Sequence, residues 1–112
     1  MATKERTITL PEVRKAAKAL DPEETNPASI MAWGNRRPCC FVGHVLRGVG
    51  APLPLPNSLG QSVGTYAMDF APPRGILLTA SAERFLQKAQ HAADDGRTWG
   101  EAIKAGNRAV AG

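Results

Sequence analysis

The stretch "RRPCCFVGHVL", residues 36–46, gathers the residue types best suited to chemistry in this chain. Cys39 and Cys40 are adjacent, and His44 follows Cys40 by four residues, so a helix would place Cys40 and His44 on one face. A thiol and an imidazole in that arrangement could share a metal ion, or act as a nucleophile and its base. The two arginines before the cysteines would favour a thiolate.

A metal site would need more ligands than this pair. Adding Cys39 and His91 gives the four soft ligands of a structural zinc, but their spacing matches no common zinc pattern. Adjacent helical residues also diverge by about 100°, and His91 falls opposite the apolar face of its own helix. We therefore expect no metal and no cofactor, and we expect the cysteines to pack as small hydrophobic residues.

Catalysis by the same residues lacks a further component. No third group is placed to orient His44, and no substrate pocket can be recognised in the sequence. We expect the protein not to be an enzyme. A thiol- or metal-dependent site at Cys39, Cys40 and His44 remains the alternative.

Helix signals account for most of the chain. Thr9 and Glu12 form a capping-box pattern before a helix that should end near Leu20, and Thr98 and Glu101 repeat that pattern near the C-terminus. Another helix is predicted to be capped by Thr79 or Ser81 and to end at Gly96, and it would bury Phe85, Leu86, Ala89 and Ala93. The remaining two helices are predicted over residues 26–34 and 38–49, the latter being central and closed by Gly50.

The middle of the chain, residues 51–78, is rich in proline and glycine and breaks the helical pattern. Within it, "TYAMDF" and "ILL" could each be extended, and a short β-hairpin between them is an option. Residues 1–7 are expected to be flexible. The predicted fold is therefore mainly α: a single small domain, residues 1–112, of four to five short helices with an irregular insertion at 51–78.

Charge and hydropathy limit the partners. The 112-residue chain has a formal net charge of +4; residues 1–60 carry eight basic and five acidic side chains, and residues 61–112 carry six and five. This excess is diffuse, so nucleic acid is not the expected partner, although weak nucleic-acid binding stays a second alternative. No apolar run reaches the roughly 18 residues of a membrane span, and we expect a cytoplasmic protein.

Two short motifs carry a resemblance. "CCFVGHVL" and "AQHAADDGRTWGEAI" resemble segments of small helical proteins of unknown function encoded by actinobacteria and their bacteriophages. Those proteins share a Cys-x-x-Gly-[His/Ala]-x-Leu helix and a closing Asp-x-Gly-x-x-Trp-x-x-Ala segment, and the resemblance covers about a third of the chain. The matching residues are Cys40, Gly43, His44 and Leu46, then Asp94, Gly96, Trp99 and Ala102. The resemblance implies a phage or actinobacterial setting, and no catalytic residues.

Small phage proteins of this kind often bind host proteins. We therefore expect a non-enzymatic interaction module that binds a host protein in the host cytoplasm, and that could also form a homo-oligomer. The expected contact surface is the part of the irregular segment from Ala51 to Gly75, with Leu53, Leu55, Tyr66 and Phe70 as its exposed apolar residues.

Overall fold

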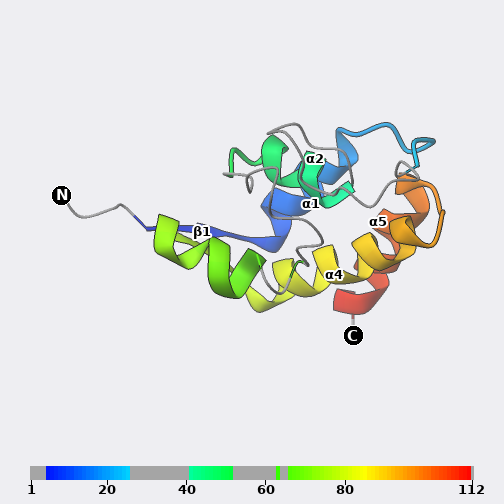
Figure 1. The fold of residues 1–112 in the computed structure, drawn as a ribbon. Coiled ribbons are helices and arrows are strands. Elements are labelled where there is room, and N and C mark those ends of the chain that lie inside the picture. The colour runs from blue at the N-terminus through cyan, green and yellow to red at the C-terminus, as the bar shows by residue number, and fades with distance from the viewer. Residues whose placement is uncertain (1–4, 26–40, 52–62, 64–65, 112) are drawn as a thin grey trace.

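The computed structural model describes residues 5–25, 41–51, 63 and 66–111, and it is mainly α, as the sequence predicts (Figure 1). The helix predicted over 26–34 and the first residues of the one predicted over 38–49 lie outside these ranges. No helix in the described ranges is long and apolar enough to cross a bilayer. The elements are β1 (Arg6–Ile8), α1 (Leu10–Lys18), α2 (Phe41–Gly48), the single π-helical turn η2 (Tyr66–Phe70), the 3-10 turn η3 (Pro72–Arg74), β2 (Ile76–Leu78), α4 (Ala80–Asp94) and α5 (Trp99–Ala111).

Both predicted capping boxes are present. The backbone N–H of Thr9 donates to the Glu12 carboxylate over 3.2 Å at the start of α1. At the start of α5 the N–H of Thr98 donates to Glu101 over 3.2 Å, and the Glu101 N–H donates back to the Thr98 hydroxyl. Each box satisfies backbone donors that the first helical turn leaves without a partner. Helix α4 is capped by Thr79, whose hydroxyl accepts from the Ala82 N–H.

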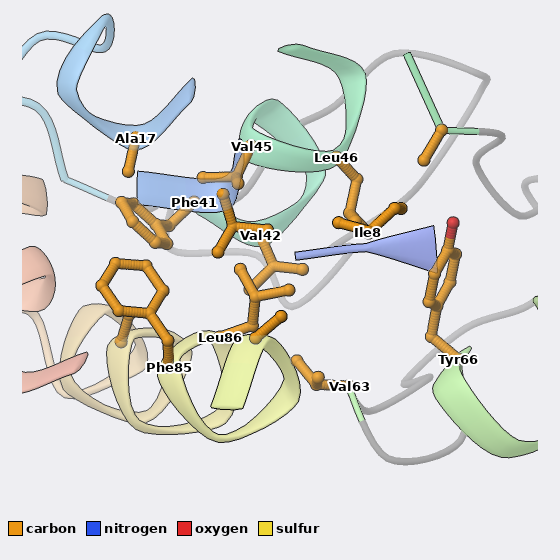
Figure 2. Packing of buried hydrophobic residues seen from close by; sticks show 14 of the residues in the cluster. Ile8, Ala17, Phe41, Val42, Val45, Leu46, Val63, Tyr66, Phe85 and Leu86 are labelled. Carbon is orange, nitrogen blue, oxygen red and sulfur yellow. The ribbon is translucent and has the colours of Figure 1, made fainter. Parts of the chain in front are cut away.

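The core gathers around α2, as expected of the central helix. One turn of α2 meets α1 where Gly48 approaches Ala16, and the N–H of Val42 donates to the Gln90 side chain of α4 over 3.1 Å. Figure 2 shows Phe41 and Val42 of α2 facing Phe85 and Leu86 of α4, with Leu46 beside Ile8. The fully buried larger side chains are Tyr66, Phe41, Phe85, Ile8, Leu46, Leu86, Val13, Val42 and Val45.

Helices α4 and α5 form the most extensive contact of the fold. A turn at Gly96, with φ of +90°, reverses the chain between them. They approach closely at Gly106, where an added Cβ would lie 2.7 Å from a ring carbon of Phe85 and 2.9 Å from the Phe85 carbonyl oxygen. Only glycine fits there, so this one position sets the distance between the two helices.

The short sheet differs from the predicted hairpin. β1 and β2 pair in parallel, with Arg6 opposite Ile76 and Ile8 opposite Leu78, so "ILL" finds its partner at the other end of the chain. Of the "TYAMDF" segment, the described residues Tyr66–Phe70 are helical, not extended. Burial of Ile8 and Ile76 on the same face of the sheet favours this pairing, which no local pattern reveals. The expected flexibility of residues 1–7 is wrong for Arg6 and Thr7, since both belong to β1.

Arg6 joins three elements. Its guanidinium donates to the Glu12 carboxylate of α1 over 3.1 Å and to the carbonyl of Val49 just after α2. A cation at that carbonyl satisfies an acceptor that the end of α2 leaves free. The chain then turns away at Gly50, whose φ is +79°.

We predict that Gly106→Ala destabilises the fold by about 1–3 kcal/mol, because the added methyl group has no room beside Phe85. On an unconstrained helix surface the same change would stabilise by about 0.5–1 kcal/mol, so the sign is diagnostic. Urea unfolding followed by circular dichroism measures the effect, with exposed Lys88→Ala on α4 as the control. A stabilised Gly106→Ala protein would contradict the close helix contact.

The capping boxes also predict a pH dependence. The backbone N–H of Thr9 and then the Arg6 guanidinium lower the pKa of Glu12, and the Thr98 N–H lowers the pKa of Glu101. A carboxyl whose pKa is lower in the folded state stabilises the fold above its unfolded pKa, and that contribution disappears as the pH falls through the folded value. Stability should therefore fall as the pH drops below the ordinary glutamate value of 4.5.

Unfolding midpoints at about pH 6 and about pH 3.5 test this dependence. In the E12Q/E101Q protein the boxes remain but do not titrate, so the difference between the two midpoints should shrink. Glu23→Gln, at an exposed side chain outside both boxes, is the control. An equal pH dependence in all three proteins would show that the boxes do not contribute.

Candidate functional site

His44 is the only member of the predicted thiol or metal site that the structure describes. Cys39 and Cys40 lie outside the described residues, so their part of the prediction stays open. The His44 ring lies 5.0 Å from the Trp99 ring, centroid to centroid, and is half buried between α2 and the start of α5. Trp99 also meets Phe41 edge-on at 6.0 Å. His44 thus takes part in the contact between α2 and α5.

The surroundings of His44 favour its neutral form. Burial is the larger cause of its lowered pKa, the Arg47 guanidinium adds to it, and the Glu24 carboxylate acts in the opposite direction. The other histidine, His91, is exposed on α4 with its Nε2 3.8 Å from an Asp95 oxygen. Within the described ranges, no three or more His, Cys, Asp or Glu residues come together to hold a metal ion.

Tyr66, predicted as an exposed contact residue, is fully buried, so that prediction is wrong. Burial raises the pKa of its hydroxyl to about 12. Its ring stacks on Phe70 at 5.2 Å with an angle of 29° between the planes. Figure 2 shows Tyr66 beside the strand that carries Ile8. The other predicted contact residues, Leu53 and Leu55, lie outside the described residues.

Phe70, also predicted as an exposed contact residue, is partly buried against the core and supports a surface cation. The Arg74 guanidinium carbon lies 3.7 Å above the centre of the Phe70 ring, and Arg74 also donates to the Phe70 carbonyl over 2.8 Å. Tyr66, Phe70 and Arg74 therefore form a continuous stack from the core to the surface. This stack fixes the orientation of the turn that lies between its members.

Met68 is the residue that the sequence interpretation missed. Its side chain is 76% exposed, more than any other large apolar side chain of the described residues; Leu77 follows at 43%. An extended segment would have put Tyr66, Met68 and Phe70 on one face. In the helical turn, Met68 points away from the two rings. The four-residue spacing of Tyr66 and Phe70, which suits one turn of a helix, was the sequence signal for this arrangement. We call Met68, Asp69, Phe70 and Arg74 the Met68 surface.

Comparisons of the chain with protein-family models, curated proteins and solved structures found no match. The arguments about its function accordingly rest on its own residues and their arrangement.

We predict that the His44 imidazole titrates below its ordinary value of 6.5, because burial beside Trp99 disfavours the cation. A histidine with a lowered folded pKa stabilises the fold above its unfolded pKa, and that contribution is lost as the pH falls through the folded value. NMR titration of the His44 ring proton gives the midpoint. Arg47→Gln should raise that midpoint, because it removes the nearby cation. A midpoint at or above 6.5 in the unsubstituted protein would contradict the buried contact.

Proposed function

We propose that this protein is a non-enzymatic interaction module, phage-encoded and active in the host cytoplasm, that binds a host protein through the Met68 surface. The observation that carries the proposal is the 76% exposure of Met68 on an ordered helical turn. Methionine is common on surfaces that adapt to protein partners, because its side chain is unbranched and polarizable. π-helical turns such as η2 are also frequent at functional sites.

The composition of the Met68 surface fits a protein interface. Residues 66–75, "YAMDFAPPRG", contain aromatic side chains, methionine and arginine, and no lysine or glutamate, although Asp69 and two alanines are also present. Interfaces between proteins are enriched in the first group and depleted in the second. The prolines of η3 are exposed beside it and add apolar area with little conformational freedom to lose on binding.

The support beneath Met68 favours binding without rearrangement. Tyr66 is anchored in the core, and Arg74 holds the other end of the turn through the Phe70 ring and carbonyl. A surface that is already ordered pays little conformational entropy when a partner docks. The stack thus gives Tyr66 a supporting role in the surface, in place of the direct contact predicted from the sequence.

The test compares proteins recovered from host lysate by four versions of the chain. The unsubstituted chain and Met68→Leu should recover the same proteins. Met68→Asp should bind them at least about tenfold more weakly, because a desolvated carboxylate replaces an apolar anchor. The exposed change Gln87→Glu on α4 adds the same charge elsewhere and should leave binding unchanged. Circular dichroism verifies that each variant folds.

Two outcomes would contradict the proposal. Equal recovery by Met68→Asp and by the unsubstituted chain would show that the Met68 surface is not the contact. Loss of binding in the Gln87→Glu control to the same extent would show that charge, and not this surface, decides recovery.

A further inference from the structure

Helices α1 and α5 lie side by side and run in opposite directions. Arg14 of α1 donates to the Asn107 side chain of α5 over 2.8 Å. The segment that follows the end of α1 meets the start of α5, where the Gly100 N–H donates to the Pro22 carbonyl over 2.9 Å. Residue numbers therefore rise along α1 as they fall along α5, which places Lys18 near the level of Lys104 and Lys15 near the level of Arg108.

The geometry of each helix places four cations along this junction, and Lys15 lies beside them on the exposed face of α1. The Ala16 side of α1 meets α2, and the opposite flank carries Arg14 and, one turn later, Lys18. On α5, Lys104 precedes Asn107 by one turn and Arg108 follows Lys104 by four residues. All but Arg14 are exposed, and Arg14 is partly exposed. We call Arg14, Lys15, Lys18, Lys104 and Arg108 the α1–α5 basic surface.

Within the described part of the chain no member of the basic surface makes an ion pair within 4 Å, although the Glu101 carboxylate, which lies 3.9 Å from Arg97, also attracts Lys104. The ion pairs there are Arg6–Glu12, His91–Asp95 and Arg97–Glu101, and none includes a member of the basic surface. Arg14 and Lys18, like Lys104 and Arg108, are like-charged neighbours four residues apart, an arrangement that slightly destabilises a helix. Its repetition on two adjacent helices is what a binding site for an anion would require.

Acidic residues bound the surface at one end. Asp21, Glu23 and Glu24 follow α1, and this loop is tied to the start of α5 by the hydrogen bond from the Trp99 N–H to the Glu24 carbonyl. The positive potential is therefore centred toward the start of α1 and the end of α5, away from that loop. An anion should be drawn to that end.

We propose that the α1–α5 basic surface binds the phosphate backbone of double-stranded DNA, an activity beyond the proposed protein interaction. Lysine is depleted in protein interfaces, whereas lysine and arginine together dominate contacts to phosphates. The exposed large apolar side chains of the described residues, Met68 and Leu77, lie on other elements, so this surface offers no apolar anchor to a protein. Arg14 and Lys18 are about 6 Å apart along α1 and the helices are about 8–10 Å apart, enough to reach several phosphates.

Fluorescence anisotropy with a labelled mixed-sequence DNA duplex of about 20 base pairs tests the proposal. With four to five phosphates contacted, the logarithm of the binding constant should fall with the logarithm of salt concentration with a slope of about −4. K15Q/R108Q should weaken binding by about tenfold or more at 100 mM salt and reduce that slope by about 2. Both side chains are exposed, so the fold should be unaffected.

Two matched variants sharpen the test. R84Q/K88Q removes the same charge from exposed positions of α4 and should weaken binding far less than K15Q/R108Q. Glu23→Gln removes a carboxylate at the acidic boundary and should strengthen binding. The absence of binding at 50 mM salt, or equal losses in the two double variants, would overturn the proposal. Tighter binding of polyglutamate than of the duplex would overturn it in favour of an acidic protein partner.

Discussion

The close contact of α4 and α5 at Gly106 is the constraint on which the other arrangements depend. An added Cβ at Gly106 would meet both the ring and the carbonyl of Phe85, so the close approach of the two helix backbones at this point requires glycine. Helix α5 is thereby held in place, and its two ends then contact different elements. Trp99 meets Phe41 and His44 of α2, while Asn107 accepts from Arg14 of α1.

The two proposed binding surfaces lie on different elements of the fold. Figure 1 shows η2, in green, at one end of the molecule and the orange and red helix α5 at the other. The Met68 surface combines the apolar Met68 and Phe70 with one aspartate and one arginine, and the α1–α5 basic surface is cationic without large apolar residues. Their chemistry therefore suits different partners. On these two proposals, a protein bound at Met68 would leave the basic surface accessible to DNA.

The sequence predicted those features that depend on residues close together in the chain. Two helix starts were predicted from capping boxes, Thr9 with Glu12 and Thr98 with Glu101, because a cap and its partner lie within one turn. The buried positions of α2 and α4 followed from helical periodicity for the same reason. These features need no knowledge of the rest of the chain.

What the sequence did not predict depends on contacts between distant segments. β2 pairs with β1, some 70 positions earlier in the chain, whereas the hairpin option paired the "ILL" strand with the nearby "TYAMDF" segment. Tyr66 was taken as exposed because a proline-rich region suggested an irregular surface, whereas the helical turn directs its ring into the core and leaves Met68 outside. The charge excess looked diffuse along the chain, and only the antiparallel packing of α1 on α5 concentrates it.

Site-specific photocross-linking from position 68 tests the central claim, that the Met68 surface contacts a protein partner, most directly. A benzophenone side chain placed at Met68 in the host cell should give a discrete adduct whose mass is the sum of this chain and another protein. The same side chain at exposed Gln87 should not give that adduct. No adduct at position 68, or an identical pattern from both positions, would contradict the claim, and an adduct of twice the chain mass would assign the surface to self-association instead.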